Sequence, residues 1–234
     1  MERSHSSSET TAVVYDLGGV LVPSGGALAA LSVALDVPQD ELAEPYWAYR
    51  DSYDEGDAPA AYWQRVGAAL GRRLDGEWVG RLDRIDVAGW SRIADDVTAM
   101  LSSLAASGIP LGVLSNAPAS LADAVRRSAW STVFQGLVFS SDVGLLKPDP
   151  RVYRAADERL GFSPANVVFF DDRPGNVAAA RAHGWRAHVW TGCEGAREVL
   201  AQEGLRDGLR DGPRDVSRDV SRDGAGRPGG PLDG

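Results

Sequence analysis

Polar residues that could do chemistry stand where apolar runs end, and this happens repeatedly along the 234-residue chain. Asp16 closes the run at 12–15 and is followed by the glycines Gly18 and Gly19. Three later runs, at 109–116, 136–142 and 165–172, end in Ser115 and Asn116, in Ser141 and Asp142, and in Asp171 and Asp172. Because the carboxyl ends of buried parallel strands meet at the edge where open α/β sheets bind ligands, these residues predict one crevice lined by carboxylates and hydroxyls.

The elements that must position these residues alternate between strands and helices. Helical patterns follow the later strands at 120–130, 150–161 and 176–184, and a further strand is predicted at 185–190. This alternation predicts an α/β fold, a three-layer Rossmann-like parallel sheet with right-handed crossovers. No GxGxxG or P-loop sequence follows any of the strands, so dinucleotide-binding and nucleoside-triphosphate-binding folds of those types lose support.

The stretch between the first and second strands is far longer than an ordinary crossover. It contains helical patterns at 27–36, 41–56 and 59–71, and the pattern at 91–108 is typical of a helix that returns to the sheet. We therefore predict an inserted helical cap at 24–89, over a catalytic core made of 11–23 and 90–203. Most aromatic residues of the cap are expected to form its own core.

The two ends of the chain have low apolar content. Residues 1–10 are polar and serine-rich, and 204–234 contain a tetrapeptide repeat of alternating arginine and aspartate. Such sequences cannot bury enough apolar surface to offset the entropy of ordering, so both ends are predicted to be disordered. No signal peptide or membrane-spanning run is evident, and a cytoplasmic location is expected.

Composition narrows the classes of partner. The net charge of −9 argues against general binding of nucleic acid or an anionic membrane, because both require a basic face. The single cysteine, Cys193, excludes an internal disulfide and makes a thiolate-rich metal site a poor fit. A small-molecule ligand and a monomer or homodimer are expected.

Four motifs in order carry a family resemblance: YDLGGVL (15–21), VLSN (113–116), KPDPRVY (147–153) and FFDDRPGN (169–176). Together they resemble the haloacid dehalogenase-like (HAD) hydrolase superfamily, subfamily I, in which a helical cap follows the first strand. The resemblance covers residues 12 to about 192. Each motif alone is a weak signal, but four in order, each after the expected element, are specific.

The resemblance implies a role for most of the polar residues. Asp16 would be the nucleophile, since a carboxylate can attack a phosphoryl group and form a covalent aspartyl-phosphate. Magnesium, which prefers hard oxygen ligands, would be held by Asp16, the backbone carbonyl of Gly18 and Asp172. The remaining site residues support this centre: Lys147 would neutralise phosphate and nucleophile, Ser115 and Asn116 would bind substrate, Asp171 would lie close by, and Asn176 would orient the carboxylates or cap a helix.

Gly18 departs from the pattern of many phosphatases in this superfamily, which carry an aspartate there as general acid. Leaving-group protonation is therefore unassigned, and aryl, acyl and anomeric phosphates are expected to be better substrates than simple alkyl phosphates. Water or a cap residue could substitute. The cap candidates, each expected to be a solvated charge, are Arg50, Asp51, Asp54 and Glu55.

Three functions are compatible with these residues. The first is a magnesium-dependent phosphatase of a small phosphorylated metabolite, such as a sugar phosphate. The second is a metal-independent haloacid dehalogenase, against which the adjacent acids Asp171 and Asp172 count, because carboxylates repel in a metal-free site. The third is a non-catalytic binding or regulatory protein, against which the joint presence of Asp16, Lys147 and Asp172 counts.

Overall fold

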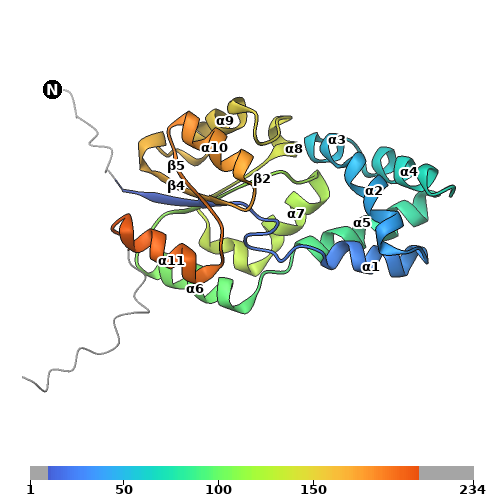
Figure 1. Ribbon diagram of the computed structural model, residues 1–234, viewed down its shortest axis with the longest axis horizontal. Coiled ribbons are helices and arrows are strands. Elements are labelled where there is room, and N and C mark those ends of the chain that lie inside the picture. Colours follow the sequence, from blue (N-terminus) through green and yellow to red (C-terminus); the bar gives the residue numbers. More distant parts are fainter. Residues whose placement is uncertain (1–9, 206–234) are drawn as a thin grey trace, which may run out of the picture.

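Five parallel strands form one sheet at the centre of the molecule, in the order β3-β2-β1-β4-β5. The structure is a computed structural model that describes residues 10–205 (Figure 1). The strands are β1 (Ala12–Tyr15), β2 (Leu111–Ser115), β3 (Gly136–Phe139), β4 (Val167–Asp171) and β5 (Arg186–Val189). The predicted parallel α/β sheet is confirmed. Residues 1–9 and 206–234, which hold most of the predicted terminal segments, lie outside the described residues.

Helices cover both faces of the sheet and complete three layers (Figure 1). One face packs α6 (Asp95–Ala106), α7 (Ala119–Arg127) and α11 (Cys193–Gln202) against inward-facing residues such as Val13 and Tyr15. The opposite face packs α9 (Pro150–Leu160) and α10 (Pro174–His183) against Val14 and its neighbours. Successive residues of β1 thus bury opposite sides, as the period of two in a strand requires, and this explains why all four are apolar and fully buried.

The strand register brings the polar ends of the sheet to one level. Tyr15 pairs with Val113 on one side and with Phe170 on the other. The next residue along each strand is therefore Asp16, Leu114 or Asp171, and the Asp16 amide donates to the Phe170 carbonyl at 2.9 Å. Two carboxylates consequently leave neighbouring strands side by side.

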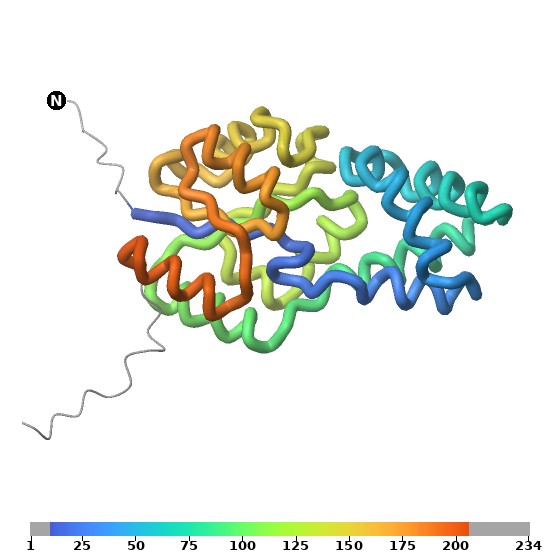
Figure 2. Tube along the Cα trace, in the orientation of Figure 1, coloured from blue at the N-terminus to red at the C-terminus, as the bar shows by residue number. Residues whose placement is uncertain are grey.

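Five helices between β1 and α6 form a separate lobe, called the cap below (Figure 2). They are α1 (Gly26–Leu35), α2 (Gln39–Ala48), α3 (Arg50–Glu55), α4 (Pro59–Ala69) and α5 (Gly76–Trp90). The cap has its own buried core, which includes Leu31, Tyr62 and Trp63. The exact boundaries predicted at 23/24 and 89/90 stay predictions.

The cap differs from its predicted pattern in two places. The single helix expected at 41–56 is two helices, because the chain turns at Tyr49 (φ −110°, ψ 5°). The fifteen-residue α5 has no counterpart among the predicted helices. Its glycines disfavour a helix, yet Gly89 is required by packing, since a Cβ there would lie 2.4 Å from the Ala27 Cα of α1.

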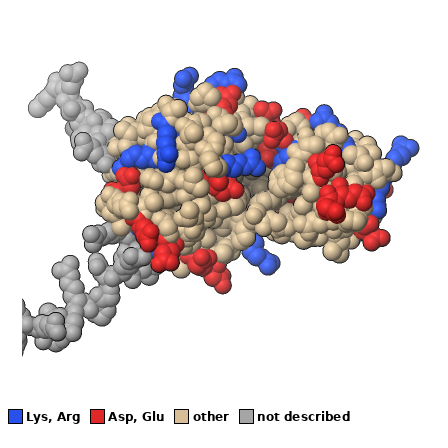
Figure 3. All heavy atoms as spheres, in the orientation of Figure 1, with Lys and Arg blue, Asp and Glu red and all other residues tan. Residues whose placement is uncertain are grey.

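A short helix, α8 (Ser140–Val143), replaces the end of the strand predicted at 136–142. Two 3-10 turns, η1 (Ala129–Val133) and η2 (Pro164–Asn166), complete the described elements. Among these elements no helix is both long enough and apolar enough to cross a membrane. The face in Figure 3 carries lysine, arginine and acidic side chains in mixture rather than a continuous basic patch.

Candidate active site

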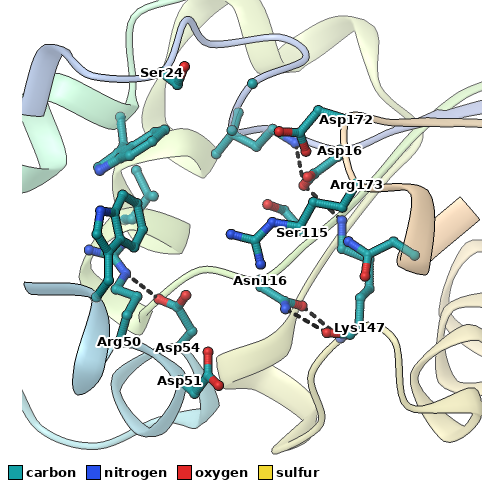
Figure 4. Close-up of a pocket in the computed structure, with 17 residues that line it drawn as sticks. Asp16, Ser24, Arg50, Asp51, Asp54, Ser115, Asn116, Lys147, Asp172 and Arg173 are labelled. Carbon is teal, nitrogen blue, oxygen red and sulfur yellow. Dashed lines mark hydrogen bonds and ion pairs between the residues drawn. The ribbon is translucent and has the colours of Figure 1, made fainter. Parts of the chain in front are cut away.

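A cavity of about 440 Å³ lies between the carboxyl ends of the strands and the cap (Figure 4). Residues from both lobes line it. The core contributes Asp16, Leu17, Gly18, Gly19, Ser24, Ser115, Asn116, Leu121, Lys147, Asp172, Arg173 and Asn176, and the cap contributes Trp47, Arg50, Asp51, Asp54 and Trp90. The crevice predicted from the strand ends is therefore present at β1, β2 and β4.

The end of β3 does not contribute to this cavity. Ser141 and Asp142, predicted to lie with the other polar strand ends, are not among its lining residues. Both residues belong to α8, and the Asp142 carboxylate pairs with Arg126 and Arg159. The prediction was wrong because β3 ends at Phe139, before its polar residues are reached.

Asp16 stands directly after β1 with its carboxylate at the floor of the cavity. Its Oδ1 accepts a hydrogen bond from the Leu17 amide at 2.7 Å and lies 2.9 Å from the Lys147 ammonium. Burial raises the pKa of Asp16, and the Lys147 charge opposes that rise. These contacts fix the Asp16 side chain. Because the residue is still 7% exposed, its carboxylate can contact a ligand in the cavity.

Lys147 joins three strand ends. Its ammonium group lies 2.9 Å from Asp16 Oδ1 and 2.7 Å from Asp171 Oδ2, and it donates to the Leu114 carbonyl at 2.9 Å. Burial alone would lower its pKa, but the two carboxylates raise the pKa of Lys147 above its ordinary value. The lysine is therefore a fixed positive charge beside Asp16.

Asn116 fixes the loop that carries Lys147. Its Nδ2 donates to the Lys147 carbonyl at 3.0 Å, and its Oδ1 accepts from the Lys147 amide at 2.8 Å. The predicted substrate-binding residue thus lines the cavity with an amide that is already engaged on both ends. Ser115, the other predicted substrate-binding residue, is buried in the cavity wall beside it.

Three carboxylates lie together at this end of the cavity, and two of them, Asp16 and Asp171, pair with Lys147. One oxygen from each of Asp16, Asp171 and Asp172 lies within 4.8 Å of the other two. Asp171 is fully buried, and Asn176 Nδ2 donates to both of its oxygens at 2.9 and 3.1 Å. Asp172 is more exposed and lines the cavity; burial and the nearby Asp171 charge raise its pKa.

Asn176 is not a helix cap. It is the third residue of α10, whose cap position is occupied by Arg173. Its amide contacts Asp171 rather than Asp172. Of the two roles open to it in the sequence, the geometry supports orientation of a carboxylate.

The glycine turn after Asp16 is shaped by close neighbours. Gly19 has φ +76°, and a Cβ there would lie 2.6 Å from Asp172 Oδ2. Only glycine adopts this conformation without strain and also leaves room for the carboxylate. The backbone bonds of the turn use the Leu17 carbonyl and the Gly19 amide, and leave the Gly18 carbonyl outside them.

These groups suit a hard divalent cation. Asp16 and Asp171 pair with Lys147, and Asp172 adds a third carboxylate. The three carboxylates outnumber the two nearby cations, Lys147 and Arg173, so the cluster carries an excess of negative charge. Magnesium in proteins commonly takes one or two carboxylates and completes its shell with water and substrate oxygens. The group is consistent with a magnesium site, and the specific set Asp16, Gly18 and Asp172 stays a prediction.

The cap wall is built around a buried arginine. The Arg50 Nε lies 2.8 Å from Asp54 Oδ1, and its Nη1 lies 2.9 Å from Asp86 Oδ2. The Tyr46 hydroxyl accepts a hydrogen bond from Arg50 Nη1 at 2.8 Å and donates one to Asp86 Oδ1 at 2.6 Å. The same hydroxyl accepts a hydrogen bond from Trp90 Nε1 at 2.8 Å. The expectation that Arg50 and Asp54 are solvated was wrong, since both are buried.

Other cap candidates behave as expected. Asp51 and Glu55 are exposed, and only Asp51 lines the cavity. Trp47 is a cap aromatic residue that lines the cavity, whereas most of the others belong to the cap core as expected. Residues missed from the sequence are Trp90 of the cap and Arg173, whose guanidinium points into the cavity in Figure 4. Arg173 stands inside the FFDDRPGN motif, directly after the two acids, and that position was the available signal.

A model of the haloacid dehalogenase-like hydrolase family matches residues 10–184. The chain is a haloacid dehalogenase-like hydrolase. This HAD hydrolase is 28% identical over 187 residues to a phosphatase of Mycobacterium tuberculosis, covering 76% of this chain and 86% of that protein. It is 29% identical over 194 residues to a phosphoglycolate phosphatase of Rhodospirillum rubrum, covering 74% and 76%.

Dehalogenases are also similar to this HAD hydrolase. The chain is 34% identical over 119 residues to an (S)-2-haloacid dehalogenase of Pseudomonas putida. The match covers 50% of this chain and about half (51%) of the length of that relative. The structure of the L-2-haloacid dehalogenase of Xanthobacter autotrophicus with covalently bound chloropropionic acid superposes with a TM-score of 0.63 at 17% identity, covering 84% of each chain. Similarity at that level shows the shared fold alone.

Proposed function

We propose that this HAD hydrolase is a magnesium-dependent phosphatase that hydrolyses a small phosphorylated metabolite through an aspartyl-phosphate on Asp16. The observation that carries the proposal is the group of three carboxylates around Lys147, with Asp172 facing the cavity. Three carboxylates that lie so close together disfavour a metal-free anion site and favour one that holds a cation together with a phosphate.

The chain's own residues supply most of the chemistry in this proposal. The Asp16 carboxylate attacks phosphorus and the bond to the leaving oxygen breaks; water then releases phosphate from the aspartyl-phosphate. Lys147 neutralises Asp16 and stays within reach of a phosphate oxygen, and Ser115 offers its hydroxyl. When bound, magnesium would be held by Asp16, the Gly18 carbonyl and Asp172, and would screen the repulsion between carboxylate and phosphate.

A haloacid dehalogenase is the second candidate. The similarity to the Pseudomonas putida enzyme favours it, and Asp16 is equally placed to attack carbon and displace halide. The two candidates differ in their dependence on metal. Chelation abolishes a phosphatase that needs magnesium and leaves a metal-independent dehalogenase unchanged.

The deciding experiment measures phosphate release from a panel of phosphorylated metabolites, and halide release from 2-haloacids, with magnesium and with EDTA. Asp16→Asn serves as the blank in both assays. Magnesium-dependent phosphate release that is absent in the blank supports the proposal. Halide release that survives EDTA, without phosphate release, would replace it with the dehalogenase.

Asp172→Asn tests the metal ligand in the same assay. The amide keeps the shape of the side chain and removes its charge, so magnesium should bind more weakly while the nucleophile remains. The magnesium concentration for half activity should rise by at least about tenfold, since loss of even an outer-shell partner of a metal ligand typically costs about 10- to 100-fold in metal affinity. An unchanged magnesium requirement would contradict a ligand role for Asp172.

A further inference from the structure

Gly18 leaves the proposed phosphatase without the acid that would protonate the departing oxygen, and the structure shows what fills that space. A Cβ on Gly18 would lie 3.2 Å from the Trp90 ring. A larger side chain at this position would therefore press against the cap. Trp90 in turn donates to Tyr46, which bonds to Arg50.

This series of hydrogen bonds, from Trp90 through Tyr46 to Arg50, ends at the carboxylate of Asp54, which lines the cavity. Asp54 is 7% exposed and lines the cavity from the cap side. Its Oδ1 is held by Arg50 Nε at 2.8 Å, and in the described part of the chain Oδ2 has no hydrogen-bond partner. In Figure 4 the Asp54 carboxylate faces the interior, across the cavity from Asp16.

The backbone of Asp54 is tied to the core. Ser140 donates its hydroxyl to the Asp54 carbonyl at 2.5 Å, and the Ala117 amide donates to the same hydroxyl at 2.9 Å. Ala117 directly follows Ser115 and Asn116 at the end of β2. The cap acid is thus held at a fixed position relative to the strand ends that line the cavity.

We propose that Asp54 is the general acid of this enzyme and that Arg50 positions it; the proposal rests on the proposed phosphatase activity. Residue 18 is a glycine because Trp90 occupies the place that the side chain of a core acid would fill. As the Asp16–phosphorus bond forms and the bond to the leaving oxygen breaks, the Asp54 carboxyl proton passes to that oxygen. The resulting Asp54 carboxylate takes a proton from the water that attacks the aspartyl-phosphate, and hydrogen phosphate leaves.

The surroundings of Asp54 suit this task. Burial raises the pKa of Asp54 to about 6, with Arg50 opposing the rise and Asp86 and Asp51 adding to it. A carboxyl with such a pKa keeps a protonated fraction near neutral pH. The ionisable groups that face Asp54 from the surrounding helices of the cap are Tyr46, Arg50, Asp51, Tyr62 and Asp86. The nearby helix α8 of the core carries Asp142, whose carboxylate is paired with Arg126 and Arg159.

The test compares Asp54→Asn with wild type on esters that differ in their leaving groups, at saturating magnesium. On ethyl phosphate, whose alkoxide leaves poorly, kcat/KM should fall about 10²–10⁴-fold, the usual contribution of a general acid. On 4-nitrophenyl phosphate, whose leaving group needs no proton, it should change little. Glu55→Gln, an exposed acid next in sequence that does not line the cavity, is the matched control and should match wild type on both.

An equal loss on both esters would overturn the proposal and make Asp54 a binding or structural residue. Wild type provides a second measurement if the variant does not fold. Its rate on ethyl phosphate should fall as pH rises through about 6, because the acid loses its proton there, while the rate on 4-nitrophenyl phosphate should not fall in that range. Parallel pH profiles would also overturn the proposal.

Failure of the proposed phosphatase gives a different result, namely no magnesium-dependent phosphate release by wild type from any ester. The comparison of ethyl phosphate with 4-nitrophenyl phosphate also revises the substrate preference for aryl, acyl and anomeric phosphates that Gly18 alone predicts. An acid at Asp54 brings alkyl phosphates within reach, whereas a strong preference for aryl, acyl and anomeric phosphates in wild type would mean that no acid acts.

Discussion

Two buried clusters face the same cavity, one in the core and one in the cap, and each is built on one cation and two carboxylates. In the core cluster, Lys147 lies 2.9 Å from Asp16 and 2.7 Å from Asp171. A third carboxylate, Asp172, lies beside these acids. The core cluster therefore has more negative charge than its lysine balances.

In the cap cluster, the charged groups form hydrogen bonds and ion pairs with one another. Arg50 lies 2.8 Å from Asp54 and 2.9 Å from Asp86, and the Tyr46 hydroxyl joins the arginine to Asp86. Asp51 stands nearby but is exposed, and among the described residues no third acid lies close enough to Asp54 and Asp86 to form a group like that of Asp16, Asp171 and Asp172. Excess charge at the core leaves a place for a cation, whereas the cap arrangement orients side chains toward the cavity.

The largest expected difference between the clusters concerns activity. Asp16→Asn should abolish turnover, by at least about a hundredfold, because the nearly isosteric amide is a poor nucleophile. Asp86→Asn should leave the nucleophile in place and lower the free energy of unfolding by about 1–3 kcal/mol, since it disturbs a buried hydrogen-bonded charge. Turnover and urea unfolding of both variants check this, and substantial activity in Asp16→Asn would require another nucleophile.

Removing the two cations should separate the clusters by their response to magnesium. Arg50→Met and Lys147→Met each leave two buried carboxylates without their partner, which costs about 3–5 kcal/mol of stability. Compared with wild type at the same magnesium concentration, the loss should shrink in Lys147→Met, because magnesium neutralises the remaining core acids. It should stay unchanged in Arg50→Met, whose core site binds magnesium as wild type does. Tm with and without magnesium measures this.

The control for these two variants is Arg65→Met. Arg65 pairs with Asp57 at 3.5 Å on the surface, with side chains 52% and 38% exposed, so its removal should cost less than about 1 kcal/mol. An equal reduction of the two losses by magnesium would show that magnesium does not take the place of the Lys147 charge at the core acids.

The smallest expected effects come from adjacent glycines that face different lobes. Gly19→Ala places a Cβ 2.6 Å from Asp172 Oδ2 at a backbone φ of +76°, so it should displace the carboxylate and raise the magnesium needed for half activity. Gly18→Ala meets only the Trp90 ring, at 3.2 Å, and should leave that magnesium requirement close to wild type. Magnesium titrations of the two variants check the contrast, which similar shifts in both would contradict.

The core could be predicted from sequence to a large extent. The strands β1, β2 and β4 are short apolar runs that end in or before polar residues, and a parallel sheet brings such ends to one edge. The helix predicted at 150–161 is likewise present as α9, and the Asp149 side chain at its start accepts from the Arg151 amide at 2.8 Å. Where the pattern failed, at Ser141 and Asp142, the strand ended earlier than the apolar run suggested.

The cap cluster could not be predicted in the same way. Arg50 and Asp54 are four residues apart on a polar helix, and the sequence around them is typical of a solvated surface. Their burial depends on Asp86, which lies 36 residues after Arg50 on a helix that was itself not predicted. Charges are buried only where partners from other elements meet them, and no local pattern reports such a meeting.

The sequence by itself determined the α/β sheet, the presence of inserted helices and the acids and lysine at the strand ends, because hydrophobic period and strand termination are local properties. Only the tertiary structure decided which carboxylates meet Lys147, that Asn116 holds the lysine loop, and that Trp90 fills the space above Gly18. These contacts join residues far apart in the chain. They therefore depend on how strands and loops of the core, and in the case of Trp90 the cap, pack together, which the order of residues in any one segment does not encode.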